Sequence, residues 1–233
     1  MVHADKTFQD KVDTTGSVTD KKAQVTTASL FGNARDNLGG GGLNRYSLAW
    51  IAGNIDIRTP PVRLADAITA RSNGRFNKLD FSFSRLQRVS DLVSVSAAIN
   101  GQLASKNLDV SEKMELGGMY GVRAYPEGEA YADQGVVVNL EVGLQMPWLS
   151  THLPGQLQLI GFVDAGQVTV NKEPWAGLST QRRTLAGAGL GVNWSNTNNF
   201  MVRAYYAFKL GNESATSAPD KSGRFWVQAV KYF

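Results

Sequence analysis

Apolar and polar residues alternate with a period of two through most of this chain, and that spacing predicts β-strands. The pattern is clear in residues 78–84, 93–103, 136–146, 156–166, 186–194, 200–210 and 223–233. Weaker patterns predict strands over residues 6–14, 23–32 and 46–57, the last with a phase slip near Ala52 that a β-bulge would explain. We therefore expect about ten strands, many of them close to the roughly 9 to 11 residues that cross a membrane when tilted.

Charged side chains are segregated from the apolar side of these strands. Glu141, Asp164, Arg203 and Lys209 all fall on the polar phase of their segments. A strand with this distribution presents one apolar face and one face suited to water or to other polar groups.

Glycines occupy the polar phase of residues 186–194. Because Gly187, Gly189 and Gly191 keep the period of two within a strand, they do not form a dinucleotide-binding fingerprint, which must open a helix after a strand. A stripe without side chains allows close approach by another backbone, such as a loop folded into a lumen, or eases the curvature of a barrel. Both explanations remain open from the sequence.

The connections between the predicted strands alternate in length. Counted from the carboxyl end, residues 209–222 are long, 195–198 short, 169–181 long, 147–154 short, 105–134 very long, 88–90 short and 58–74 long. Antiparallel strands joined in sequence place every second connection at the same end of the sheet, so one end carries long loops and the other tight turns. Outer-membrane barrels have this asymmetry.

Alternation does not by itself decide which face meets water. A soluble lipocalin-like barrel or a β-sandwich buries its apolar face and shows the same period. Charged residues make up 19% of the chain, below the usual figure of about 25%. Together with the loop lengths, the segregated charges and the terminal Phe233, this favours an all-β fold, an antiparallel transmembrane β-barrel.

The residue types that carry most enzyme chemistry are scarce. The chain has no cysteine, which removes disulfides, thiolate nucleophiles and the usual structural zinc sites. Its two histidines, His3 and His152, are interpreted as surface residues and not as catalytic or metal-binding groups. Since no nucleophile and base arrangement is present, we do not expect an enzyme, a metal site or a cofactor.

Several other classes of protein are also disfavoured. The 24 basic and 20 acidic side chains give a formal charge of only +4, which does not indicate nucleic-acid binding. No apolar run approaches the roughly 20 residues of a spanning helix, and residues 1–11 lack the apolar centre of a secretory signal. Glycines 39–42 are not followed by the Lys-Ser or Lys-Thr pair of a phosphate loop, so they are interpreted as a turn.

The longest connection, residues 105–134, contains a segment rich in glycine and aromatic residues. Residues 116–130 have the sequence LGGMYGVRAYPEGEA. Loops longer than about 12 to 15 residues without secondary structure of their own tend to be functional or disordered. The low charge and the aromatic content of this loop predict that it packs against another part of the molecule.

Two short motifs resemble those of a known family. Residues 121–125, Gly-Val-Arg-Ala-Tyr, are close to the Val-Arg-Gly-Tyr or Phe signature in the inward-folded loop of outer-membrane translocases and barrel insertases. Residues 161–166, Gly-Phe-Val-Asp-Ala-Gly, look like the Phe-x-Asp-x-Gly signature on the strand that follows. With Asn139 and Glu141 between them and Gly-Arg-Phe-Trp-Val at residues 223–227, the chain most resembles the two-partner secretion transporters, also called hemolysin secretion/activation proteins.

The resemblance implies roles for particular residues. The loop bearing Arg123 would fold into the lumen, and its guanidinium would pair with the Asp164 carboxylate and pin the loop tip to the barrel wall. A planar, permanently charged fork suits a carboxylate in a confined site. The other motif residues expected to pack around this pair are Gly121, Val122, Tyr125, Glu141, Phe162 and Gly166.

The end of the chain also has an implied role. Phe233 would help the barrel-assembly machinery to recognise the final strand. Lys231 shares its face, so the lysine would have to extend its charged end to the membrane interface.

Two departures from the family pattern matter. Ala124 stands where the family has glycine, so the loop would be strained if that position needs a positive φ. The family has a sixteen-stranded barrel preceded by two POTRA domains and a plug helix, whereas residues 1–233 supply only about ten strands, with no POTRA domain or signal peptide. Because an open sheet leaves backbone groups unpaired in lipid, we expect the carboxyl-terminal barrel portion of a longer parent.

The resemblance implies translocation of a large unfolded exoprotein, such as a hemolysin or adhesin, across the Gram-negative outer membrane. No cofactor is implied. The expected partners are that exoprotein, outer-membrane lipids and lipopolysaccharide, and the barrel-assembly machinery, but not nucleic acid; the carboxyl terminus would lie on the periplasmic side. The alternatives are a barrel insertase, a porin-like channel that would not need the Arg123 and Asp164 pair, and a soluble β-barrel that binds a small apolar ligand.

Overall fold

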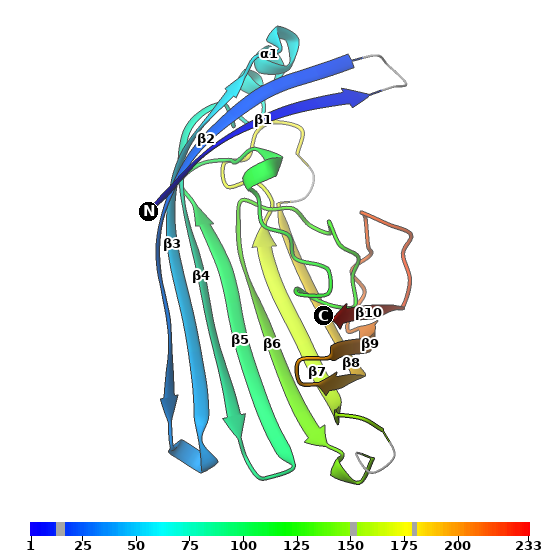
Figure 1. Cartoon of the computed structure of the whole chain (residues 1–233). Coiled ribbons are helices and arrows are strands. Elements are labelled where there is room, and N and C mark those ends of the chain that lie inside the picture. Colours follow the sequence, from blue (N-terminus) through cyan, green and yellow to red (C-terminus); the bar gives the residue numbers. More distant parts are fainter. Residues whose placement is uncertain (13–16, 150–152, 179–180) are drawn as a thin grey trace.

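The computed structural model describes residues 1–12, 17–149, 153–178 and 181–233. It forms a ten-stranded antiparallel sheet in which the strands follow their order in the sequence (Figure 1). The strands are β1 (Val2–Val12), β2 (Ser17–Asp36), β3 (Gly42–Ile57), β4 (Gly74–Arg88), β5 (Val93–Ala104), β6 (Gln134–Gln145), β7 (Gln156–Thr169), β8 (Arg182–Asn196), β9 (Phe200–Lys209) and β10 (Gly223–Lys231). The helices are α1 (Pro60–Ile68) and the single-turn η1 (Leu38–Gly40), η2 (Val110–Glu112) and η3 (Pro147–Leu149).

Every strand predicted from the alternation is present, and most are longer than predicted. β2 extends well beyond the predicted residues 23–32 because residues 33–36 pair with β3 at one end and residues 17–20 pair with β1 at the other. The predicted first strand, residues 6–14, begins earlier, at Val2; residues 13 and 14 lie outside the described residues, as does His152. Within the described ranges, no helix is long and apolar enough to cross a membrane.

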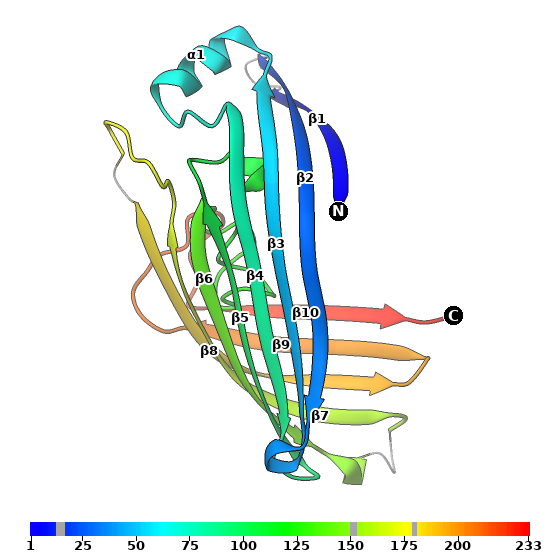
Figure 2. The same ribbon diagram turned by 90° about the vertical axis from the view of Figure 1, so that its left-hand side faces the viewer.

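The predicted alternation of long and short connections is confirmed. The long connections are residues 58–73, 105–133, 170–181 and 210–222, and the shorter ones are residues 37–41, 89–92, 146–155 and 197–199. Figure 2 shows α1, in the connection from β3 to β4, at the opposite end of the strands from the turn between β2 and β3. That turn contains Gly39, Gly40 and Gly41, all with positive φ, which agrees with its interpretation as a turn.

The apolar sides of the strands face outward and are exposed. Leu140 on β6, Val163 on β7 and Leu190 on β8 are 50%, 46% and 71% exposed. The polar partners Asn139 and Asp164 lie opposite each other on the other face of β6 and β7. A soluble barrel or sandwich would bury the apolar face, so that alternative is contradicted and the predicted outward apolar face is confirmed.

The bulge predicted near Ala52 is wrong. β3 pairs without interruption with both β2 and β4 through this position. The pattern changes because the outward apolar residues end at Trp50, while Ile55 lies on the inner face and is buried. A second core covers that inner face, and its buried residues are Ala23, Val25, Ile51, Ile55, Ile57, Phe76, Ala104 and Leu108.

The connection from β5 to β6, residues 105–133, lies on the concave side of the sheet (Figure 1). We call it the inward loop. Figure 2 shows β8, β9 and β10 running at a steep angle to β2–β5, so the sheet curls around this loop. Among the described pairings, β1 is joined only to β2 and β10 only to β9, so the sheet is not closed.

Candidate functional site

Arg123 of the inward loop reaches the inner face of β7. Its side chain is 4% exposed, and Asp164 opposite it is fully buried. The Arg123 Nε donates to Asp164 Oδ2 at 2.8 Å, Nη2 donates to Oδ1 at 2.8 Å, and the backbone N–H of Arg123 donates to Oδ2 at 3.1 Å. The side chains thus form a two-pronged ion pair, which is the pairing that the family resemblance implied.

Two side chains on β6 complete this arrangement, which we call the Arg123 latch (Arg123, Asn139, Glu141 and Asp164). The third guanidinium nitrogen, Nη1, donates to Glu141 Oε1 at 2.6 Å. The Asn139 amide donates to Asp164 Oδ1 at 2.8 Å and to the Gly121 carbonyl at 2.9 Å. Burial alone would lower the pKa of Arg123, but the hydrogen bonds and charges of Asp164 and Glu141 outweigh it and raise that pKa. The guanidinium therefore stays charged inside the protein.

Aromatic rings cover the guanidinium. Its central carbon lies 3.5 Å from the centroid of the Phe162 ring and 5.2 Å from that of Tyr205. The Trp226 indole N–H donates to the Arg123 carbonyl at 2.7 Å. Such rings favour a cation and exclude water from the ion pair. The sequence motifs included Phe162 and Trp226, but Tyr205 was missed; its place on the polar phase of residues 200–210, level with the bare glycine stripe, is the signal that could have found it.

The loop turns sharply just before Arg123. The Gly121 N–H donates to the Gly118 carbonyl at 3.1 Å, and the Val122 N–H donates to the Leu116 carbonyl at 2.8 Å. A Cβ at Gly121 would lie 2.3 Å from the Leu116 carbonyl oxygen, so only glycine fits there. The turn leaves Val122 fully buried and directs Arg123 toward β7.

The glycine stripe of β8 accommodates the loop. A Cβ on Gly187 would lie 2.5 Å from the Ala124 methyl carbon, so the two positions share one space. This supports the first explanation for the stripe, close approach by another backbone. Ala124 is not among the described residues with a positive φ, so the strain considered for an alanine at this position does not arise.

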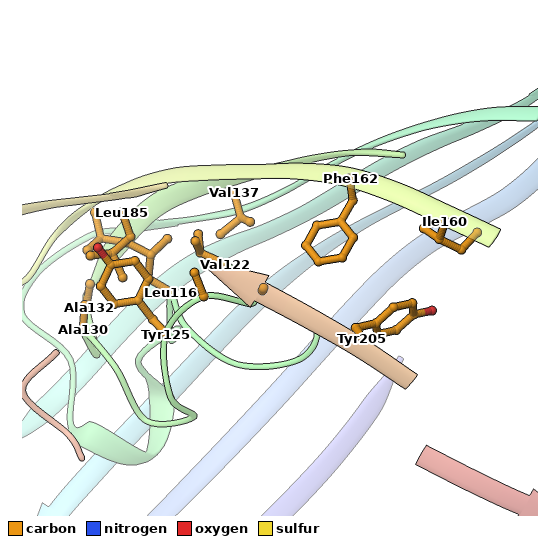
Figure 3. Packing of buried hydrophobic residues seen from close by; sticks show 13 residues of the cluster. Leu116, Val122, Tyr125, Ala130, Ala132, Val137, Ile160, Phe162, Leu185 and Tyr205 are labelled. Atoms are coloured by element: carbon orange, nitrogen blue, oxygen red, sulfur yellow. The ribbon is translucent and has the colours of Figure 1, made fainter. Parts of the chain in front are cut away.

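The remaining motif residues lie in or against the buried core next to the latch. Tyr125 is fully buried, and its hydroxyl donates to the Glu213 carbonyl at 2.9 Å. Gly166 makes room for Leu116, whose Cδ1 would lie 2.4 Å from a Cβ at that position. Figure 3 shows Tyr125 beside Leu185 and Leu116, with Phe162 and Tyr205 facing each other farther along the cluster. Of the motif residues, Gly121, Glu141 and Phe162 thus contact the latch, whereas Val122 and Tyr125 lie in the adjoining core and Gly166 contacts Leu116 of that core.

Phe233 lies apart from this cluster. It is fully exposed, two residues beyond the last residue of β10. The Lys231 ammonium contacts the Asn199 side chain at the turn from β8 to β9, near the end of the sheet. The role of Phe233 in assembly stays a prediction.

The site is suited to holding and releasing a loop. In the described part of the chain, no group of three or more His, Asp or Glu side chains is placed to hold a metal ion. The two carboxylates of the latch are instead balanced by Arg123 and by amide donors. Such a centre can bind or free the loop tip without forming or breaking a covalent bond.

Comparison with known proteins adds two kinds of likeness. The Heme/hemopexin transporter protein HuxB of Haemophilus influenzae (strain 86-028NP) is 26% identical over 215 residues, which cover 91% of this chain and 37% of HuxB. The solved structure of CdiB from Escherichia coli superposes with a TM-score of 0.59 at 14% identity, covering 99% of this chain and 49% of CdiB. This chain thus spans little more than a third of the length of HuxB, and the CdiB likeness supports the fold.

The family assignment rests on a match to most of the chain. The family model for the haemolysin secretion/activation protein ShlB/FhaC/HecB matches residues 19–194. That range includes the Arg123 latch and most of the sheet. The chain therefore belongs to the haemolysin secretion/activation protein family ShlB/FhaC/HecB, whose members are outer-membrane transporters of Gram-negative bacteria.

Proposed function

We propose that the protein carrying this chain moves a large unfolded exoprotein through a lumen bounded by the inner face of the sheet. The observation that carries the proposal is the inward loop, held on that face by the buried pair of Arg123 and Asp164. The outward apolar residues suit a lipid environment, and the inward polar residues suit a water-filled path. A loop inside that path must yield before a polypeptide can pass.

The latch has the properties of a contact that can open. Its hydrogen bonds join the tip of a loop to Asn139, Glu141 and Asp164, whose positions are fixed by the paired strands β6 and β7. Water or a polar segment of the exported chain could replace the donors and acceptors when the loop leaves. A passive pore would have no need for a fully buried ion pair at a loop tip.

The proposed cargo is named only by class, as a hemolysin-type or adhesin-type exoprotein. HuxB is named for heme/hemopexin transport, and at 26% identity that particular cargo is not transferred to this chain. In the same proposal, outer-membrane lipids and lipopolysaccharide surround the apolar face, and the short-turn end, with the carboxyl terminus, lies on the periplasmic side. The barrel-assembly machinery would recognise the final strand through Phe233. Export of this kind needs no covalent catalysis and no cofactor.

The test replaces the loop cation in the full-length protein that carries this chain. Arg123→Gln removes the charge but keeps a long polar side chain. The matched control is Arg58→Gln, since Arg58 is exposed and its ion pair, among the described residues, is with the nearby Asp56. An epitope-tagged exoprotein expressed with each variant is measured in the medium, and insertion is measured by heat-modifiable migration and by recovery in the outer-membrane fraction.

We expect Arg123→Gln to reduce export at least tenfold while insertion is unchanged, and Arg58→Gln to leave both unchanged. Normal export by Arg123→Gln would show that the latch has no part in transport. Loss of insertion would show that Arg123 serves assembly and not export.

A further inference from the structure

A second charged centre lies on the inward loop, six positions beyond the latch arginine. Glu129 is fully buried, and its carboxylate accepts hydrogen bonds from the last connection of the sheet, residues 210–222 between β9 and β10. The Thr216 N–H and hydroxyl donate to it at 2.8 and 2.7 Å, and the Ser217 N–H and hydroxyl donate at 2.9 and 3.0 Å. The carboxylate thus organises the backbone of another loop.

A cation from the sheet completes this centre. Arg183 on β8 donates from Nη1 to Glu129 Oε1 at 2.8 Å, from Nε to Glu213 Oε1 at 2.6 Å, and from Nη2 to the Ser214 carbonyl at 2.8 Å. We call Glu129, Arg183, Thr216 and Ser217 the Glu129 junction. It joins three separate elements: the inward loop, β8 and the connection 210–222.

Further contacts join the same two loops. The Ser217 hydroxyl oxygen also lies 3.1 Å from the Glu127 carbonyl oxygen, and Ala215 packs against the core that contains Tyr125. The junction is therefore the centre of an interface between the inward loop and the connection 210–222, and not an isolated ion pair.

The backbone beside Glu129 is held in an unfavourable conformation. Ala130 has a φ of 56°, in the left-handed region that residues with a Cβ rarely occupy. The residue is buried in the core beside Tyr125 and Leu185 (Figure 3). Such strain persists where surrounding contacts hold the chain, and the bonds to Glu129 supply those contacts.

The ionised form of Glu129 is the form these contacts stabilise. Burial alone would raise the pKa of this carboxyl, but the N–H groups of Ser217 and Thr216, the Thr216 hydroxyl and Arg183 outweigh it and lower the pKa to about 2. At neutral pH the carboxylate is charged and accepts from all of these donors.

We propose that Glu129 is a positioning residue that fastens the inward loop to the connection 210–222, and that export through the lumen requires this second anchor to open. The first part stands on the geometry, and the second part rests on the proposed function. The junction is distinct from the Arg123 latch because it binds the loop to another connection, whereas the latch binds it to the strands of the sheet.

The contact between the two loops can be tested without a transport assay. Residues 1–233 contain no cysteine, so pairs of cysteines can be introduced there as probes. A Cβ on Gly128 would lie 3.9 Å from the Ser217 Cβ, within the roughly 3.5 to 4.5 Å of disulfides. The pair Gly128→Cys and Ser217→Cys should therefore cross-link on oxidation in the full-length, membrane-inserted protein. Adding Glu129→Gln should slow cross-linking at least tenfold, whereas the control Glu127→Gln, at an exposed carboxylate, should change it less than twofold.

A second probe covers the case in which the cysteine at Gly128, where φ is +74°, disturbs the loop. A single Ala215→Cys should react slowly with a maleimide because Ala215 packs against the buried core. Glu129→Gln should raise that rate at least tenfold, and Glu127→Gln should not. If Glu129→Gln changes neither the cross-linking nor the labelling, Glu129 is not an anchor.

The transport part is tested with the cross-linked protein. Oxidised Gly128→Cys/Ser217→Cys protein should lose at least nine-tenths of its export of the tagged exoprotein, and reduction should restore it. Unchanged export with the disulfide in place would overturn the requirement for opening. Export that is absent in the oxidised, reduced and unmodified proteins alike would instead contradict the proposed function.

Discussion

The inward loop is held by two charged centres of opposite construction. At the Arg123 latch the loop supplies the cation and the sheet supplies two carboxylates, whereas at the Glu129 junction the loop supplies the carboxylate and β8 supplies Arg183. The latch acceptors lie on paired strands, where register fixes their positions. The junction donors at Thr216 and Ser217 lie on the connection 210–222, and none of the described strand pairings fixes their positions.

This difference predicts how strongly each centre holds. A partner fixed by a sheet is already arranged for binding, so little conformational entropy is lost when the loop docks. A partner on a long connection must be ordered together with the loop, which costs part of the gain. We therefore expect damage to the latch to have larger effects than damage to the junction.

The largest expected effect is that of Asp164→Asn. Among the described residues it leaves the buried Arg123 with Glu141 as its remaining counter-charge, and breaking a buried pair costs about 3–5 kcal/mol. The freed loop tip should expose the peptide bond after Arg123, so tryptic cleavage there in the inserted protein should rise at least a hundredfold. Asp91→Asn, which removes an exposed pair with Arg88, is the control. Equal protection of Arg123 in both variants would contradict a dominant latch.

The same variant sharpens the comparison when the junction probe is added. Cross-linking between cysteines at Gly128 and Ser217 should persist in Asp164→Asn, since the two centres bind the loop to different elements. If Asp164→Asn removed this cross-linking as well as the protection of Arg123 from trypsin, the whole inward loop would leave the sheet as one unit.

Next in size is the effect of Gly187→Ala. The added methyl would meet the Ala124 methyl carbon at 2.5 Å, and overpacking of this kind costs typically about 1–3 kcal/mol. Tryptic cleavage after Arg123 should rise about tenfold or more, and Ala124→Gly in the same protein should restore protection by freeing the space. The control is Gly161→Ala on the outward face, where the nearest atom would lie at an ordinary 3.6 Å. Failure of Ala124→Gly to rescue would show that the two positions do not compete for space.

A smaller effect is expected from Thr216→Val at the junction. It removes one hydroxyl donor to Glu129 but keeps the backbone N–H bond, and a single hydrogen bond contributes about 1 kcal/mol. Maleimide labelling of Ala215→Cys should rise roughly fivefold, while Thr184→Val on the exposed part of β8 should leave it unchanged. A change as large as that in Glu129→Gln would mean that the hydroxyl, and not the whole junction, holds the loops together.

The smallest effect is expected from mild acid. Because the pKa of Glu129 is lowered to about 2, its contribution to docking is fully present above the ordinary carboxyl value of 4.5 and is lost as the pH falls from there through about 2. Maleimide labelling of Ala215→Cys, after correction for the thiol's own pH dependence, should be constant from pH 7.5 to 6. Cross-linking of the Gly128→Cys and Ser217→Cys pair by a pH-insensitive bifunctional reagent should also persist at pH 5. It should decline only below about pH 4. A decline centred near pH 6 would mean that another group controls the junction.

The family resemblance implied the pair of Arg123 and Asp164, and both residues also carry local signals. Alternation placed Asp164 on the polar face of its strand, and the motif around Arg123 marked the loop tip. The Glu129 junction has no comparable signal. Thr216 and Ser217 lie in an irregular connection, where no periodicity reports which way a side chain points.

The error near Ala52 has a related cause. The period of two reports that a side chain points to one face or the other, but not what that face meets. Ile55 points inward, and it is buried because Leu108 of the inward loop covers that part of the sheet. The inner face of β3 is covered near Ile55, so apolar residues occur on that face there. In the sequence this looks the same as the shift of phase that a β-bulge would cause.

The sequence by itself determined the strands, the polar phase on which Asp164 lies, and the ends at which long and short connections lie; the pairing of Arg123 with Asp164 was implied by the resemblance of two short motifs to a known family. These features depend on periodicity and on short motifs, which are local. Only the tertiary structure decided that Tyr205 covers the guanidinium, that Ala124 fits against Gly187, and that Glu129 fastens two loops together. Those contacts form where the curled sheet brings distant connections to one place, and no local pattern encodes which distant side chain will arrive there.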